Sequence, residues 1–134
     1  GLDSDEWYHL GLDLDEVDPS RAPEAYQRAI ELNPGNADAH VNLGRLLQLK
    51  GKLKQAKRHY EKALSAVANH QLAHYNLGTI FDELDQVEQA AEYYRRAPSV
   101  PDAHYNLARI FELKGDELAA QRHMRNYRKL LDGD

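Results

Sequence analysis

The chain has 134 residues, of which 42% are hydrophobic and 29% are charged, so a packed domain of ordinary size is expected and disorder is not. It contains no cysteine, which excludes disulfides, thiolate metal sites and cysteine nucleophiles. The formal net charge of -5 disfavours nucleic-acid binding through bulk electrostatics, and no apolar run is long enough to cross a membrane.

A short motif built around Asn, Leu and a small residue recurs along the chain. It reads AHVNLG at residues 39–44, AHYNLG at 73–78 and AHYNLA at 103–108, and a weaker copy without the Asn, WYHLG, lies at 7–11. The repeated leucines are Leu10, Leu43, Leu77 and Leu107, which gives spacings of 33, 34 and 30 residues. Self-similarity at such a period is the signature of a protein built from stacked structural repeats.

A second pattern follows each copy of this motif and consists of Ala, an aromatic residue four positions later, and Ala three positions after that. Both patterns place apolar residues at three- and four-residue spacing, which is typical of helices. Gly51 and Gly115 lie between the two patterns and mark turns. The second-pattern residues are Ala22, Tyr26 and Ala29, then Ala56, Tyr60 and Ala63, then Ala90, Tyr94 and Ala97. The last copy departs slightly, with Ala120, Met124 and Tyr127.

Together these patterns resemble the tetratricopeptide repeat (TPR). The resemblance implies an all-α, TPR-type α-solenoid: a right-handed superhelix of four helix-turn-helix repeats with eight antiparallel helices. We expect a single TPR domain over residues 1–134, with repeats at about 4–36, 37–70, 71–100 and 101–134. Three departures are visible: Asp85 replaces the usual turn glycine, Pro23 lies early in a second helix, and the third repeat is four residues short.

The resemblance also implies a concave groove lined by the first helix of each repeat. Since the repeated Leu faces the core, helical geometry places the residues one and two before it, and two and five after it, on the opposite face. These are Tyr8, His9, Leu12 and Asp15; Val41, Asn42, Arg45 and Gln48; Tyr75, Asn76, Thr79 and Asp82; and Tyr105, Asn106, Arg109 and Glu112.

The recurring Asn42, Asn76 and Asn106 are the main candidates for peptide binding in this groove. An Asn amide carries two donors and an acceptor, so a row of them can hold a peptide backbone without demanding a particular sequence. The row resembles the asparagine ladder of other TPR superhelices, although such residues also occur in this repeat as solvated positions. Tyr8 and its counterparts add amphipathic contact area, unless they are covered between neighbouring hairpins.

A second groove type in this family, the carboxylate clamp, holds a C-terminal carboxylate between basic residues. Val41, Tyr75 and Tyr105 stand where its first Lys would fall, so we do not expect a clamp. Arg45 and Arg109 could still receive an acidic side chain from a partner.

Neither a metal nor a cofactor is expected. His40, His74 and His104 occupy the same place in successive repeats, but equivalent residues of stacked hairpins lie about 10 Å apart, too far to share one ion. Packing histidines are the better interpretation. No catalytic constellation or phosphate-binding loop can be placed, and the charges of the basic run at residues 122–129 spread around a helix axis.

The sequence therefore predicts a non-catalytic scaffold that binds a protein or peptide. Two alternatives stay open: a self-association module, and a regulatory segment of a larger bacterial protein. The acidic first residues are unlike a secretory signal, so cytoplasm is the default location. The start without Met is consistent with a piece of a longer protein.

Self-association is expected to involve the shortened third repeat. Pro98 follows Ala97 directly, and Pro101 follows three residues later, so the helix should stop early and the link should be stiff. The last hairpin could pack in place with a defect near Tyr94 and Leu107, or swing out into a domain-swapped homodimer. In the second case Met124 and Tyr127 are candidate contacts.

Overall fold

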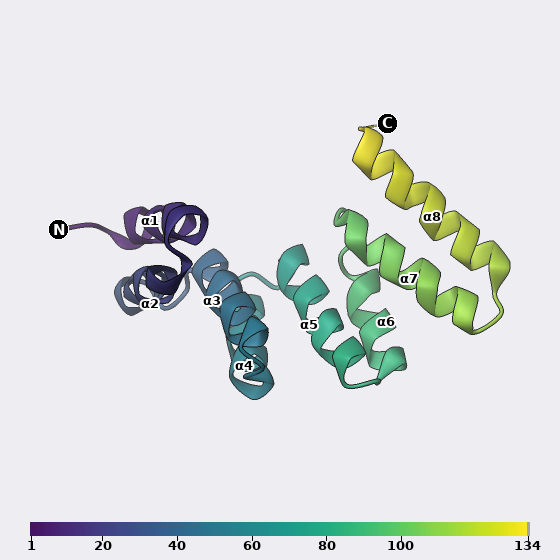
Figure 1. Ribbon diagram of the computed structural model, residues 1–134, viewed down its shortest axis with the longest axis horizontal. Helices are drawn as coiled ribbons and strands as arrows, with labels where there is room; N and C mark the ends of the chain where they lie inside the picture. The colour runs from purple at the N-terminus through teal and green to yellow at the C-terminus, as the bar shows by residue number, and fades with distance from the viewer. Residues whose placement is uncertain (134) are drawn as a thin grey trace. The chain divides into compact units, whose positions relative to one another are not determined.

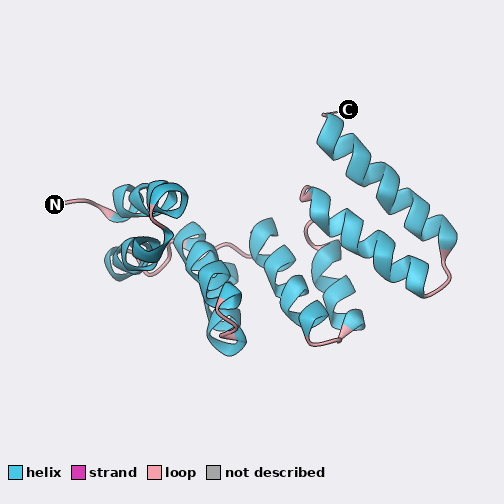
Figure 2. Cartoon of the chain, viewed as in Figure 1, coloured by secondary structure: helices cyan, strands magenta, loops and turns pink. Residues whose placement is uncertain are grey.

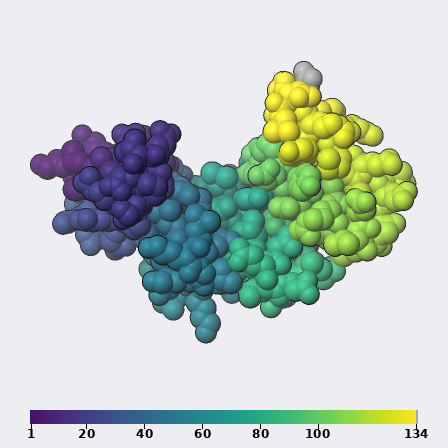
Figure 3. Space-filling model, viewed as in Figure 1, coloured from purple at the N-terminus to yellow at the C-terminus, as the bar shows by residue number. Residues whose placement is uncertain are grey.

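The computed structural model describes residues 1–133, and every regular element in that range is helical (Figures 1 and 2). The chain forms two compact units, Gly1–His70 and Gln71–Asp134 (Figure 3), each made of two helical hairpins. The first unit contains α1 (Ser4–Val17), the short 3-10 turn η1 (Pro19–Arg21), α2 (Ala22–Leu32), α3 (Ala37–Leu49) and α4 (Leu53–Ala66). The second contains α5 (Gln71–Glu83), α6 (Val87–Arg95), α7 (Pro101–Leu113) and α8 (Glu117–Asp132).

Local sequence signals explain where several helices begin. Asp3 and Glu6 form a reciprocal capping box at the start of α1, with the Glu6 amide donating to Asp3 at 2.8 Å and the Asp3 amide donating to Glu6 at 3.0 Å. Asn36 accepts from the third amide of α3, and Asp116 does the same for α8, each at 3.1 Å. Pro101 is the first residue of α7, where its missing amide hydrogen costs nothing.

The turns inside the second, third and fourth hairpins each contain a left-handed residue. Gly51 and Gly115 have φ values of 78° and 81°, and Asp85 takes the same role with φ of 59°. Asp tolerates this region better than most side chains, because its short polar group can bond locally. The loss of the turn glycine in the third hairpin therefore leaves the hairpin itself intact.

Buried tyrosines dominate the core of both units. Tyr26, Tyr60 and Tyr94 are at most 1% exposed, and each ring lies against a glycine of the partner helix. A Cβ atom built on Gly11, Gly44 or Gly78 would lie 2.4–2.6 Å from the facing ring, so only glycine permits this approach. The fourth hairpin replaces the pair with Ala108 and Met124.

The shortened third hairpin packs in place within its unit. Helix α6 has 9 residues, whereas α4 has 14. The link to α7 is held by a hydrogen bond from the Ser99 amide to the Gln71 side chain at 2.7 Å and by one between the His104 ring and the Pro98 carbonyl at 2.8 Å. Ala97 is fully buried, and Tyr94 and Leu107 share one core cluster at 1% exposure each, so the packing defect expected there is not seen.

Met124 and Tyr127 lie on α8 and are half-buried, and the Tyr127 ring lies 5.4 Å from that of Tyr105. The domain-swapped homodimer through Ala97, Pro98, Pro101, Met124 and Tyr127 stays a prediction.

Candidate functional site

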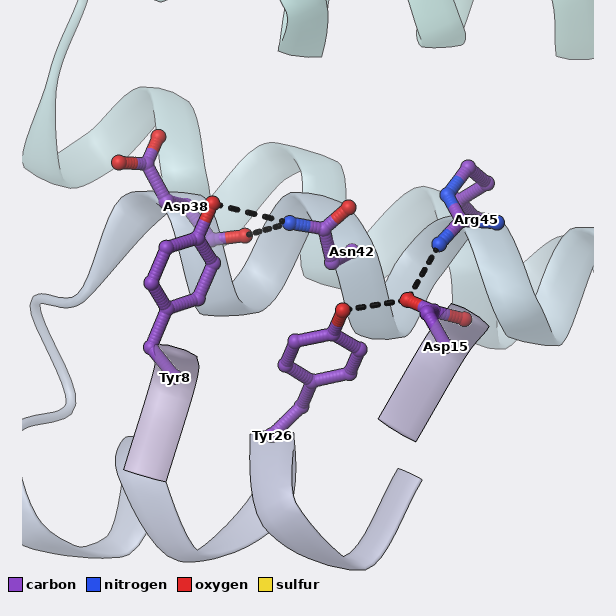
Figure 4. A network of polar contacts seen from close by, with 6 residues as sticks. All are labelled: Tyr8, Asp15, Tyr26, Asp38, Asn42 and Arg45. Atoms are coloured by element: carbon purple, nitrogen blue, oxygen red, sulfur yellow. Dashed lines mark hydrogen bonds and ion pairs between the residues drawn. The ribbon is translucent and has the colours of Figure 1, made fainter. Parts of the chain in front are cut away.

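The polar face of the first helices is the candidate binding surface, and in the first unit it is formed by α1 and α3. Asn42 on α3 donates its side-chain amide to the Tyr8 hydroxyl on α1 at 3.3 Å and to the Asp38 carbonyl at 3.2 Å (Figure 4). Burial raises the pKa of Tyr8, with a smaller contribution from Asp38, while the bond from Asn42 acts in the opposite direction. Asn42 therefore joins the first two hairpins.

Asp15, which lies on α1 about two helical turns after Tyr8, is the centre of a second polar contact. Its carboxylate accepts from the Tyr26 hydroxyl of α2 and from the Arg45 guanidinium of α3, the latter at 2.8 Å (Figure 4). The Asp15 side chain is 17% exposed and that of Arg45 is 41% exposed. Burial, followed by the bond to Asp15, raises the pKa of Tyr26, so this hydroxyl stays a donor at neutral pH.

The second unit repeats this arrangement with different residues. The Tyr94 hydroxyl donates to Asp82 at 2.8 Å, and Arg109 pairs with the same carboxylate. Burial, more than the nearby Asp102, raises the pKa of Tyr75, while the neighbouring Asn106 side chain acts in the opposite direction. A similar arrangement thus occurs on α1 and α3 in the first unit and on α5 and α7 in the second.

The positions expected for the groove have mixed outcomes. Val41 is only 3% exposed, so its assignment to the open face of the groove was wrong. Tyr105 is 49% exposed. Of the remaining positions, His9 and Glu112 are exposed. The others are half-buried: Tyr8, Leu12, Asp15, Asn42, Arg45, Gln48, Tyr75, Asn76, Thr79, Asp82, Asn106 and Arg109. Thr79 donates its hydroxyl to the Asn76 carbonyl at 2.7 Å.

Sequence reasoning missed the roles of Asp15 and Asp82 as acceptors shared by a tyrosine and an arginine. The signal was present, because each Asp stands five residues after the repeated Leu and each Arg two residues after the next one. Gln48 holds the corresponding place in the second hairpin and accepts from the Tyr60 hydroxyl at 2.7 Å.

These contacts decide what the surface can offer a ligand. Arg45 and Arg109 already pair with carboxylates, which lowers their attraction for an acidic side chain of a partner. Asn42 uses both donor hydrogens of its amide on Tyr8 and Asp38, which leaves its side-chain oxygen as an acceptor for a ligand. The result is a polar surface with little net charge at its centre, suited to the amide groups of a peptide backbone.

Two histidine pairs lie away from this face and have identical geometry. The Nδ1 atoms of His40 and His59 are 3.0 Å apart, and His40 Nε2 lies 2.9 Å from the Pro34 carbonyl. His104 and His123 repeat the arrangement, again with Nδ1 atoms 3.0 Å apart. A carbonyl only accepts, so Nε2 of the inner ring carries a hydrogen. Its Nδ1 then accepts from the outer ring, which requires a neutral inner histidine.

This requirement predicts a loss of stability in mild acid. Burial lowers the pKa of His40 and His123, and it lowers the pKa of His59 to about 4. Nearby positive charges also lower these pKa values: Lys62 and Arg58 at the first pair, and Arg122 and Arg95 at the second. The unfolded chain takes up protons as pH falls through about 6.5, whereas the folded chain resists until about pH 4 for His59. Stability is therefore full above pH 6.5 and decreases between pH 6.5 and 4.

Thermal unfolding followed by circular dichroism between pH 7.5 and 5 should show a falling midpoint. The matched control is His59→Tyr with His123→Tyr, which copies Tyr93, the residue at this place in the third hairpin. Its midpoint should change less over the same interval. An equally steep decline in the control would assign the acid sensitivity to other groups.

Over residues 1–133 the structure holds no group of three or more His, Cys, Asp or Glu side chains placed to bind a metal ion. In the same range, none of the helices is both long and apolar enough to pass through a membrane.

Comparison with protein-family models gives two matches, both described as tetratricopeptide repeat. One covers residues 25–58 and the other residues 47–103. A comparison with curated protein sequences finds no significant match.

The chain is also similar to solved structures. A MamA crystal structure aligns with a TM-score of 0.78 at 19% identity, covering 97% of this chain and 79% of that one. MamA from Desulfovibrio magneticus RS-1 aligns with a TM-score of 0.73 at 24% identity, covering 98% and 77%. PilF from Pseudomonas aeruginosa aligns with a TM-score of 0.82 at 23% identity, covering 95% of this chain but only 60% of its own. At these identities the likeness establishes the fold alone.

Proposed function

Because this chain belongs to the tetratricopeptide repeat family, whose members are generally protein-interaction scaffolds, we propose that it is a non-catalytic scaffold that binds an extended peptide segment on the first-helix faces. The observation that carries the proposal is the repetition of one polar surface in both units. In each, an Asn beside a Tyr lies next to an Asp–Arg pair on the same face of the first helices.

The chemistry of this surface favours main-chain recognition. Asn42 is half-buried and held in place by the Tyr8 hydroxyl, so little side-chain entropy is lost when it binds a ligand, and Asn106 is half-buried beside Tyr75. Asn76 occupies the same place on α5. The exposed Tyr105 ring adds apolar contact area beside the amides.

The test compares a triple variant with a control that separates binding from packing. Asn42→Ala, Asn76→Ala and Asn106→Ala together should weaken peptide binding at least about tenfold, since each net hydrogen bond contributes about 0.5–1.5 kcal/mol. The probe is a peptide selected from a random displayed library on the wild-type protein and then measured by fluorescence anisotropy.

The control is Tyr8→Phe with Tyr75→Phe, which removes the hydroxyl that Asn42 binds and its counterpart beside Asn106 but leaves the asparagines themselves. It should lose some thermal stability and retain binding. Equal affinity of the triple variant and the wild type, or failure of any peptide to be enriched, would contradict the proposal. A loss of binding in the control alone would assign the tyrosines, not the asparagines, to recognition.

A further inference from the structure

The charges of the first unit are divided between its two hairpins. Residues 1–36 contain nine acidic and two basic side chains, whereas residues 37–70 contain seven basic and two acidic ones. Such a division within one unit is unlike the interspersed charges that keep a protein surface inert. It gives a second copy of the chain a complementary surface to meet.

The division is sharpest at the turns that join the two helices of each hairpin. We define the acidic tip as Asp13, Glu16, Val17 and Asp18, at the end of α1. The basic tip consists of Leu49, Lys50, Lys52 and Lys54, from the end of α3 to the start of α4. Val17 is 79% exposed and Leu49 is 75% exposed. Each tip therefore consists of an exposed aliphatic side chain among charges of one sign. The basic residue nearest in sequence to the acidic tip is Arg21 in η1.

Both tips lie at the same edge of the unit. The Tyr8–Asn42 bond joins the earlier parts of α1 and α3, and the Asp15–Arg45 pair joins their later parts. Hence the two helices run in the same direction side by side, and the turns that follow them are neighbours.

In the second unit, the corresponding neighbouring tips are joined by an ion pair. Lys114 corresponds to Lys50, since both follow the repeated Leu by seven residues, and Lys114 pairs with Glu88 of the adjacent tip at 2.6 Å. Glu88 stands two residues before Ala90. The equivalent position in the first hairpin, two residues before Ala22, is the uncharged Ser20, so the repeat offers Lys50 no matching carboxylate there. In the part of the chain that the structure describes, Lys50, Lys52 and Lys54 form no ion pair.

We propose that the edge of the first unit is a self-association surface, in which the basic tip of one copy docks against the acidic tip of a second copy. Because the tips are neighbours, a two-fold axis between the copies brings both pairs together at once and forms a closed, isologous contact. Val17 and Leu49 then cover each other at the centre of each pair. The contact is small, which places it among weak and transient associations.

Sedimentation velocity of the full chain across protein concentrations tests the proposal. At about 20 mM salt the wild type should dimerise, and the dissociation constant should rise at least about tenfold at about 500 mM salt, because exposed charge pairs are screened. A wild type that is monomeric at every concentration would overturn it. So would a dimer that is indifferent to salt, or one whose dissociation constant is unchanged by the reversals below.

Two charge reversals make the test specific. The first variant, Lys50→Glu with Lys52→Glu and Lys54→Glu, has two acidic tips. The second variant, Asp13→Lys with Glu16→Lys, makes the acidic tip basic, so that both of its tips are basic. Each variant alone should be monomeric, and an equimolar mixture should form a heterodimer. The matched control is Arg125→Glu, Arg128→Glu and Lys129→Glu on exposed positions of α8, which should dimerise like the wild type.

The remaining alternative is that the basic tip binds a different anionic partner, such as a nucleic acid. A wild type that stays monomeric but binds a fluorescent double-stranded DNA, in a manner lost in the Lys50, Lys52 and Lys54 variant, would overturn self-association in favour of nucleic acid. Circular dichroism of every variant confirms that loss of association is not loss of folding.

Discussion

Replacing Tyr94 with Ala should destabilise the chain by roughly 3–5 kcal/mol, the range for truncation of a buried aromatic residue. The Tyr94 ring is 1% exposed, fills the space against Gly78 and belongs to the core cluster with Leu107 and Ile110. Its hydroxyl is also a donor to Asp82, which Arg109 shares. Truncation therefore removes packing and a polar link to the next hairpin together.

Chemical denaturation with urea measures the effect, and Tyr94→Phe separates its two parts. The Phe variant keeps the ring and should lose only about 0.5–1.5 kcal/mol, the net contribution of one hydrogen bond. A midpoint for Tyr94→Ala close to that of the wild type would mean that this ring does not support the core.

The fold was predictable because its signals are repeated. The Leu, the small residue after it and the Ala–aromatic–Ala pattern occur in several phased copies, so a departure in one copy does not obscure the period. Asp85 and Pro23 illustrate this. Asp85 takes the left-handed conformation itself, and α2 begins at Ala22, directly before the proline.

The candidate surface was less predictable, because helical geometry assigns a direction to a side chain but not a partner. Val41 was placed in the groove by its position, yet only 3% of it is exposed. Arg45 and Arg109 were read as available cations, and the structure pairs each with an aspartate from the preceding hairpin. Such contacts depend on how hairpins stack, which a pattern within one repeat does not encode.

The repeats also contain an internal comparison that gives the last prediction. Glycine faces tyrosine in the first three hairpins, at positions 11 and 26, 44 and 60, and 78 and 94, whereas Ala108 and Met124 stand in the fourth. A Cβ on Gly78 would lie 2.6 Å from the Tyr94 ring, and that ring cannot move away because it is buried. The flexible Met side chain leaves room for the extra methyl group.

Gly78→Ala should therefore destabilise the wild type. Overpacking costs about 1–3 kcal/mol, and the better helix propensity of Ala offsets about 0.5–1 kcal/mol of it. In a Tyr94→Met background the clash is gone, so the same substitution should be neutral or stabilising by up to about 1 kcal/mol. A double-mutant cycle in urea measures the coupling between the two positions. Equal costs of Gly78→Ala in both backgrounds would show that the glycine is kept for a reason other than the tyrosine ring.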